Sequence, residues 1–255
     1  MAHFAIIPFN IGLLPADLPN WFGLPDGHPY ARVENMPIQF YLILLANRKI
    51  LVDAPSYTFP EDDGDLLPEF KGRTAAGLLT ESGVLPESIT QVLITHPHID
   101  HTLGLVNSAD APSFPNARHY LSAKDWQNLA NMDDLHRHPL EVIEKAGLLT
   151  LVDGPLDLGD GLTLVPAPGE TPGHQIVWIK HDEGETCIVG DLFHHPLEFA
   201  EADCHPVWAD AQTMQASKLI FMQRAATSKA NVFFTHIEGA WKVDTPPQLP
   251  TWKKV

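Results

Sequence analysis

The chain has 255 residues, of which 44% are hydrophobic and 19% charged, and its 32 acidic against 16 basic side chains give a net charge of −16. Such a charge repels a polyphosphate backbone, which argues against nucleic acid as a partner and leaves a small-molecule substrate. No apolar run approaches the roughly eighteen residues that a membrane span needs, so we expect no membrane partner either.

The N-terminus and the cysteines bear on the cellular compartment. The first residues, MAHFAIIPFNIG, have no basic segment before their apolar patch and no small-residue cleavage site, so they do not look like a secretory signal. Cys187 and Cys204 are the only cysteines, and they are not spaced as a metal-binding pair. We therefore expect a cytoplasmic protein. With no repeat and no low-complexity linker, residues 1–255 are expected to form a single domain.

The first half of the chain alternates loops with short regular elements. Residues 12–35 are rich in proline and glycine and predict a loop. Alternating side chains at 38–43, followed by KILVD at 49–53, predict a strand hairpin. Three more elements follow: a long loop over 54–71, a helix over 73–82 stopping at Gly83, and a short buried strand over 91–95.

The second half predicts strands with interspersed helices. The strands are expected at 117–121, 162–167, 175–180, 186–190 and 231–235, and the helices at 122–130, 139–146 and 210–227. The last helix has Asp210 as its N-cap and Ala216, Leu219, Met222 and Ala226 on one face. His136 and His138 are expected as surface residues in a loop. The pattern predicts an α/β or α+β fold with helices packed on sheets.

The segment THPHIDHTLG, residues 95–104, places four metal-ligand side chains directly after a predicted strand. Imidazole nitrogens and carboxylate oxygens bind Zn²⁺ at ~2.0 to 2.2 Å, and a catalytic site needs about three protein ligands plus an open position. His96 and His98 can point to the same side of an extended backbone, while Asp100 and His101 can face a second ion as the chain bends. One short segment can therefore serve two ions.

Two ions need further ligands, and three candidates stand where a buried strand meets a loop. These are His174 in ETPGHQ, Asp191 in IVGDLF and His236 in FFTHIE. The set HPHIDH, TPGH, GD and a late TH, spread over residues 53–236, resembles the metallo-β-lactamase superfamily of binuclear hydrolases. The resemblance implies a four-layer αββα sandwich. It also implies two divalent metal ions, Zn²⁺ first, with Fe, Mn or Co as alternatives.

The resemblance also assigns roles to residues. It places His96, His98 and His174 on the first ion and Asp100, His101 and His236 on the second, with Asp191 bridging the two. Asp53, which closes KILVDA, matches an aspartate that supports the ligand loop without binding the ions; capping of a strand end is the alternative. In such a site the paired ions lower the pKa of water from about 15.7 to about 7, so the expected reaction is hydrolysis by a bridging hydroxide. Asp100 is also a candidate catalytic residue, because its second oxygen can steer the nucleophile or return a proton.

The ligand set is most similar to that of the lactonase and organophosphate-hydrolase branch, where many lactonases place a substrate-binding tyrosine shortly after the bridging aspartate. This chain has Phe193, His194 and His195 there. A protonated ring nitrogen of His194 or His195 can donate the same hydrogen bond. His194 is therefore a candidate catalytic residue, and Phe193 and His195 are candidate substrate-binding residues. The alternative is an exposed histidine pair.

Aromatic residues in the predicted loops favour a neutral or hydrophobic substrate, and core packing is the alternative for each of them. They are Trp21, Phe22, Tyr57, Phe59, Phe193, Phe199 and Trp208. The leading hypothesis is a hydrolase of lactones or esters, with phosphotriesters as a side activity. The alternatives are a mononuclear iron enzyme that oxidises sulfur compounds, a β-lactam hydrolase and a non-catalytic metal-binding protein. The branch often forms homodimers, which makes a homodimer the implied assembly.

Overall fold

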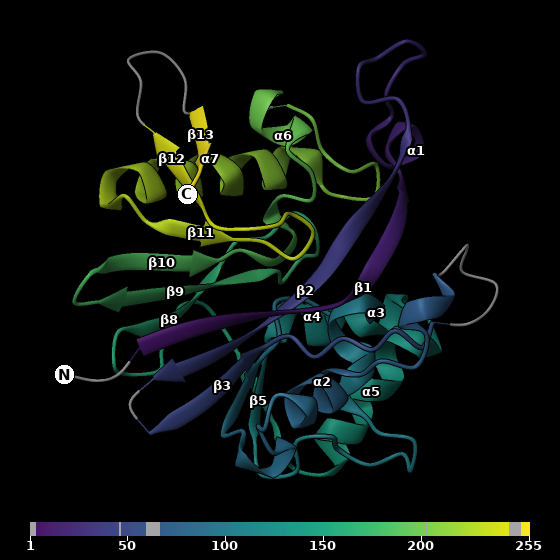
Figure 1. The fold of residues 1–255 in the computed structure, drawn as a ribbon, viewed down its shortest axis with the longest axis vertical. Helices are drawn as coiled ribbons and strands as arrows, with labels where there is room; N and C mark the ends of the chain where they lie inside the picture. The colour runs from purple at the N-terminus through teal and green to yellow at the C-terminus, as the bar shows by residue number, and fades with distance from the viewer. Residues whose placement is uncertain (1–3, 46, 60–66, 202, 245–250) are drawn as a thin grey trace. The chain divides into compact units, whose positions relative to one another are not determined.

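The computed structural model describes residues 4–45, 47–59, 67–201, 203–244 and 251–255 (Figure 1). They group into two compact units: unit 1 is Met1–Leu13 with Ile38–Gly154, and unit 2 is Leu14–Pro37 with Pro155–Val255. The unit boundaries fall inside two long strands, β1 (Phe4–Asp17) and β2 (Val33–Leu45). A single domain over residues 1–255 stays a prediction.

The described strands of unit 1 belong to a six-stranded sheet in the order β1-β2-β3-β4-β5-β6. After β2 come β3 (Arg48–Val52), β4 (Gln91–Leu93), β5 (Arg118–Ser122) and β6 (Leu149–Val152). β2 and β3 form the predicted antiparallel hairpin, and β3, β4, β5 and β6 pair in parallel. Because neighbouring parallel strands end at the same edge, the residues after β3 and those after β4 meet there.

The described helices of unit 1 are α2 (Ala75–Glu81), α3 (Ile99–Thr102), α4 (Ala123–Asn128) and α5 (Asp134–Lys145), with 3-10 turns η1 (Pro68–Phe70), η2 (Pro86–Ser88), η3 (Leu103–Leu105) and η4 (Leu129–Asn131). Three of these α-helices, namely α2, α4 and α5, begin at side-chain caps, whereas α3 does not. Asp133 caps α5 by accepting from the backbone N–H of His136, so this helix starts earlier than predicted. The loop predicted for His136 and His138 is therefore wrong. Each has a carboxylate partner, at 2.7 Å from Asp133 and 2.6 Å from Asp110.

The described strands of unit 2 belong to a seven-stranded sheet in the order β13-β12-β11-β10-β9-β8-β7. They are β7 (Leu156–Asp157), β8 (Leu162–Pro166), β9 (Gln175–His181), β10 (Gly184–Ile188), β11 (Asn231–Phe233), β12 (Trp241–Asp244) and β13 (Thr251–Lys254). β10 and β11 are parallel, and β9 is antiparallel to β10. The ends of β10 and β11 and the start of β9 therefore share one edge.

The helices of unit 2 are α1 (Leu18–Phe22), α6 (Leu197–Ala200) and α7 (Ala211–Ser228), with a 3-10 turn η5 (Gly190–Leu192). Asp210 caps α7 as predicted, accepting from the backbone N–H of Thr213 at 2.9 Å. The predicted apolar face is only partly buried, since Met222 and Ala226 are buried but Leu219 is 54% exposed. Ser217 and Lys218 are buried instead, because each has a polar partner inside the unit.

The loop predicted over residues 12–35 is wrong in its first part. β1 continues to Asp17, and α1 follows at once. The loop was predicted from prolines, but those near β1 and α1 are compatible with regular structure. β1 is the edge strand of its sheet, where Pro8 and Pro15 remove no inner ladder bond, and Pro19 lies in the first turn of α1, where no intrahelical donor is needed. Part of the long loop predicted over 54–71, residues 60–66, lies outside the described residues.

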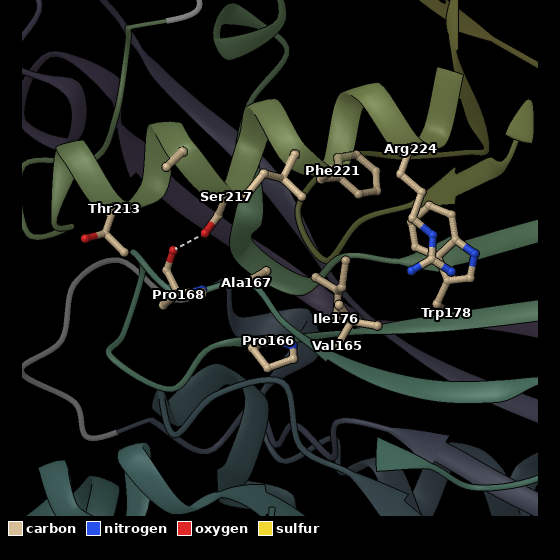
Figure 2. A pocket seen from close by; sticks show the side chains of 12 residues that line it. Val165, Pro166, Ala167, Pro168, Ile176, Trp178, Thr213, Ser217, Phe221 and Arg224 are labelled. Atoms are coloured by element: carbon tan, nitrogen blue, oxygen red, sulfur yellow. Dashed lines mark hydrogen bonds between the residues drawn. The ribbon is translucent and has the colours of Figure 1, made fainter. Parts of the chain in front are cut away.

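A cavity of about 290 Å³ lies within unit 2 where α7 packs against β8 and β9 (Figure 2). Apolar side chains such as Ile176 and Phe221 line most of it, and the Arg224 guanidinium stacks over the Trp178 ring at 3.7 Å. None of the predicted metal ligands is among its lining residues. Within the described parts of the chain, we find no helix with the length and hydropathy to cross a bilayer. The cytoplasmic location stays a prediction.

Candidate metal centre

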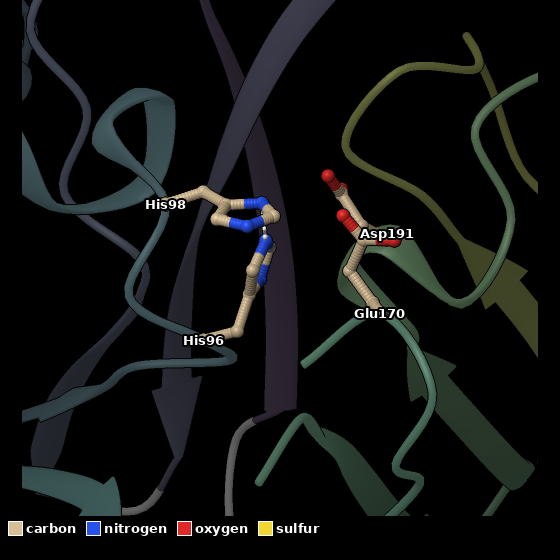
Figure 3. A group of neighbouring side chains, drawn as sticks. All are labelled: His96, His98, Glu170 and Asp191. Atoms are coloured by element: carbon tan, nitrogen blue, oxygen red, sulfur yellow. Dashed lines mark hydrogen bonds between the residues drawn. The ribbon is translucent and has the colours of Figure 1, made fainter. Parts of the chain in front are cut away.

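The predicted ligands of unit 1 lie together at the end of β4. His96 and His101 are fully buried, and α3 starts directly after His98. Nε2 of His96 lies 2.9 Å from Nδ1 of His98, as the dashed line in Figure 3 marks. Nε2 of His101 lies 3.6 Å from an Asp100 oxygen. The four side chains therefore gather as the sequence spacing predicts.

Asp53 holds this segment from the end of β3. Its carboxylate accepts the backbone N–H of Thr95 at 2.8 Å, the Thr95 hydroxyl at 2.9 Å and Nδ1–H of His101 at 2.8 Å. Asp53 itself has a φ of 63°, a left-handed conformation that costs a non-glycine residue about 1 kcal/mol or more. Gly104 closes the segment, because a Cβ there would lie 2.3 Å from the carbonyl oxygen of Pro55. Asp53 thus contacts a candidate ligand as a supporting residue would.

The predicted ligands of unit 2 lie at the shared edge of β9, β10 and β11. Asp191 follows β10, and its backbone N–H donates to Nε2 of His174 at 3.2 Å. One of its carboxylate oxygens lies 3.3 Å from Nε2 of His236. All three side chains are buried, with exposures of 4% or less. Unit 2 therefore brings together the three candidates that came from separate segments.

The ring orientations of these histidines fit metal binding. Nδ1–H of His174 donates to the Ala167 carbonyl at 3.0 Å, and Nδ1–H of His236 donates to the Pro37 carbonyl at 2.9 Å. In unit 1, Nδ1 of His101 faces Asp53 at 2.8 Å, and Nδ1 of His96 faces the Thr95 hydroxyl at 3.0 Å. Metal-binding histidines are typically held this way, with one nitrogen on a protein acceptor and the other presented to the ion. The donor sets of the two units fit two divalent metal ions of the zinc type.

Glu170 is a buried carboxylate that the sequence reasoning missed. It is 5% exposed, and one of its oxygens lies within 4.8 Å of Asp191, beside which Figure 3 draws it. The indole N–H of Trp208 donates to Glu170 at 2.7 Å. One signal was available in the sequence, because Glu170 stands in the same ETPGHQ segment as His174.

His194 lies between carboxylates in the interior of unit 2. Its Nε2 is 3.4 Å from Asp191 and 3.6 Å from Glu170. Burial alone would lower the pKa of the imidazole, but the charges of Glu170 and Asp191 outweigh burial and raise this pKa well above its usual value. An imidazolium at this position offers a hydrogen-bond donor.

Glu198 and Lys218 hold the loop that bears His194. One Glu198 oxygen accepts the backbone N–H groups of His194 at 2.6 Å and His195 at 3.0 Å, and the other pairs with Nζ of Lys218. Both charged side chains are almost fully buried. Burial opposes ionisation of Glu198, yet Lys218 and His194 lower its pKa to about 2. These two residues carry no motif, so the sequence reasoning did not find them.

The other two residues predicted for substrate binding have different surroundings. Nε2 of His195 donates to Glu34 at 3.0 Å, and its Nδ1 accepts the Leu197 N–H at 3.1 Å. Phe193 is fully buried against Phe221 and neighbouring rings, a core position that does not support substrate contact. The alternative of an exposed histidine pair is wrong, since His194 is 1% and His195 6% exposed. The roles assigned to individual residues stay predictions.

Comparison with known proteins gives one family and a consistent set of relatives. The family model described as the metallo-beta-lactamase superfamily matches residues 35–235. An N-acyl homoserine lactonase of Bacillus thuringiensis is 24% identical over 217 residues, which cover 79% of this chain and 82% of the relative. Among solved structures, the dizinc quorum-quenching lactonase AidC, in complex with a product, has a TM-score of 0.79 at 20% identity and covers 99% of this chain and 95% of its own.

A second solved structure, the hydrolase AbOPH in the beta lactamase superfamily, has a TM-score of 0.82 at 18% identity and covers 99% of this chain and 94% of its own. These likenesses confirm the predicted mixed α/β fold of two sheets with helices. They also confirm the predicted resemblance to the lactonase and organophosphate-hydrolase branch, and with it the class of metal-dependent hydrolase.

Proposed function

Because the chain belongs to the metallo-beta-lactamase superfamily, we propose that it is a binuclear metal-dependent lactonase that opens the ring ester of N-acyl homoserine lactones or similar lactones and esters. The observation that supports this most directly is the orientation of His101, His174 and His236, whose Nδ1 atoms are held by protein acceptors in both units. The names of the lactonase relatives suggest the substrate class. One domain and a homodimeric assembly remain part of the proposal.

The proposed ligand assignment follows the family motif. His96, His98 and His174 would hold one ion, Asp100, His101 and His236 the other, and Asp191 both. When bound, the ions supply a hydroxide nucleophile at neutral pH and polarise the carbonyl of the substrate. One water is consumed for each turnover: its oxygen joins the carbonyl carbon, the ring C–O bond breaks, and the ring oxygen leaves as a hydroxyl.

His194 is the residue we propose to orient the substrate carbonyl. Its ring is surrounded by Glu170, Asp191 and Glu198, whose charges favour the protonated form. A protonated Nε2 donates a hydrogen bond, which is what the tyrosine of related lactonases does. His195 is engaged with Glu34, so its ring is not proposed for this role. Asp100 is proposed to return a proton to the leaving oxygen from its second carboxylate oxygen.

The test is a screen of the purified protein after reconstitution with Zn²⁺, Mn²⁺, Co²⁺ or Fe²⁺. The substrates are hexanoyl homoserine lactone, an aryl ester, a phosphotriester and a β-lactam. We expect the lactone to be hydrolysed fastest and the phosphotriester as a side activity. Elemental analysis should find about two ions per chain. Dominant β-lactam hydrolysis, or one iron per chain with no hydrolysis, would contradict the proposal.

A control variant separates catalysis from metal binding that only stabilises the fold. Asp191→Asn keeps the size of the side chain but removes its charge. If the protein is a catalyst, this variant should keep its circular dichroism spectrum and lose lactone hydrolysis. A wild-type protein that binds two ions, folds and hydrolyses none of the four substrates would instead indicate a non-catalytic metal-binding protein.

A further inference from the structure

Two aromatic side chains of unit 2 contact the candidate substrate-binding imidazole of His194, and a third packs against one of them. The rings of Phe22 and Trp208 meet the His194 ring edge-on, with centroids 6.4 Å and 5.9 Å away. Trp21 meets Trp208 in the same manner at 5.3 Å. We call Trp21, Phe22 and Trp208 the aromatic wall. The wall places apolar rings next to the His194 imidazole.

The exposure of Trp208 distinguishes it from the other tryptophans. All six tryptophans lie in the described residues, and Trp208 is the most exposed of them, at 44%. Phe22, by comparison, is 7% exposed and packs in the core. An exposed apolar side chain beside a cluster of polar side chains is typical of the lining of a substrate-binding site. Trp208 therefore offers an apolar face beside the candidate reaction site.

The Trp208 indole is held in place rather than free to rotate. Its N–H donates to Glu170 at 2.7 Å, and the preceding residue, Val207, donates its backbone N–H to the Trp21 carbonyl at 2.8 Å. The same Glu170 oxygen lies 3.6 Å from Nε2 of His194. One carboxylate thus sets the distance between the indole and the imidazole. A rigid aromatic surface of this kind binds apolar groups at little entropic cost.

We propose that Trp208, positioned by Glu170, takes the acyl chain of the substrate and gives the enzyme a preference for long-chain lactones. The inference rests on the proposed function. A substrate whose carbonyl accepts from His194 has its first methylene groups within reach of the indole, because the two rings are neighbours. Longer chains cover more of the exposed indole face and lose more contact with water, so they bind more tightly.

The experiment measures kcat and KM for butanoyl and decanoyl homoserine lactone with the zinc-loaded wild type and with Trp208→Ala. We expect the KM for the decanoyl substrate to rise about tenfold in the variant and the KM for the butanoyl substrate to rise by a smaller factor, because the shorter chain has less contact with the indole, so the preference for the longer chain falls. Trp208→Phe, which keeps an aromatic face, should recover most of the preference. Trp241→Ala, a partly exposed tryptophan of the same unit, is the matched control and should leave the chain-length ratio unchanged.

The outcomes separate the inference from the function on which it rests. A wild type that hydrolyses neither lactone contradicts the proposed function itself. A wild type that hydrolyses both, with the same chain-length ratio in Trp208→Ala, contradicts only the role of Trp208. An equal loss of kcat for both substrates would also overturn it, because a wall residue acts through binding. If Trp208→Ala does not fold, Trp208→Leu keeps apolar volume without the indole and answers the same question.

Discussion

The candidate ligands of unit 1 come from one stretch of six residues, 96–101, whereas those of unit 2 come from three separate segments. Unit 1 supports its stretch with one carboxylate, Asp53, through hydrogen bonds. Unit 2 supports His194 with buried charges, namely Glu170, Glu198 and Lys218. A contiguous segment needs little more than a strand end to be placed. The loop of His194 in unit 2 instead lies among buried charges that must be balanced by one another.

Two buried histidines show the same contrast. His119 in β5 is fully buried and has no carboxylate partner among the described residues, and burial lowers its pKa to about 4. His194 is equally buried, but Glu170 and Asp191 raise its pKa well above the usual value. Burial disfavours the protonated imidazole in both cases, and the charges of neighbouring residues decide whether the pKa is finally lowered or raised. The ionisation of a histidine in this protein therefore depends on its unit's charges and not on depth alone.

The largest effect is expected from removing one ligand in either unit. His98→Ala in unit 1 and Asp191→Asn in unit 2 should each lower kcat/KM for the lactone by more than about 100-fold, the upper range for residues that only support a ligand. The bound metal should fall in both, measured by elemental analysis. If either variant keeps wild-type activity and metal content, the substituted residue is not a ligand.

The next largest effect concerns the buried ion pair of unit 2. Lys218→Met leaves the Glu198 charge buried without its partner, and we expect a loss of about 3 to 5 kcal/mol in the free energy of unfolding, measured with urea. Arg137→Met, which breaks the exposed Arg137–Asp134 pair in α5, is the control and should cost less than about 0.5 kcal/mol. Adding Glu198→Gln to Lys218→Met should recover part of the loss. Equal costs for the two pairs would refute the contrast between the units.

A smaller effect is expected at the support of unit 1. Asp53→Asn keeps one acceptor oxygen but loses the charge that faces Nδ1 of His101. We expect a 10- to 100-fold fall in metal affinity or kcat/KM, at about wild-type stability. Asp110→Asn is the control, because Asp110 also has a positive φ and a histidine partner but lies in an exposed loop. An Asp53→Asn variant with full affinity would show that this aspartate only caps its strand.

The smallest effect is a pH dependence of stability at His119. Because its pKa is lowered in the folded state to about 4, the unfolded chain takes up the proton first as the pH falls below 6.5. The stabilisation is complete above pH 6.5 and is lost as the pH falls towards 4. Between pH 7 and 5 the wild type should lose about 1 to 2 kcal/mol more than His119→Gln. An equal loss of stability in the wild type and in His119→Gln over this pH range would contradict the prediction.

The sequence was informative where chemistry and a strand end coincide. HPHIDH follows β4, GD follows β10, and TH follows β11, so the seven predicted ligands could be named from spacing and resemblance. It was less informative about Glu170, Glu198 and Lys218, which are single charged residues like many on the surface. Their roles depend on burial, and an acidic chain offers many carboxylates to choose from.

Two elements were misassigned for the same reason, because a local sequence pattern does not show where a residue lies in the folded protein. The prolines of β1 read as loop signals, because edge position is a property of the sheet and not of the segment. The buried residues of α7 differ from the apolar face seen in the sequence, because a hydrophobicity pattern does not show that Lys218 and Ser217 have polar partners inside the unit.

By itself the sequence determined the fold class and the candidate metal ligands, since strand periodicity and ligand spacing are local properties of the chain, and its resemblance to a family gave the class of hydrolase. Tertiary structure alone decided which charges are buried together, that His194 faces Glu170 and Asp191 while His195 faces Glu34, and that Phe193 packs in the core. The physical reason is that desolvation and ion pairing depend on neighbours from distant segments. Only folding brings those neighbours within a few ångströms of each other.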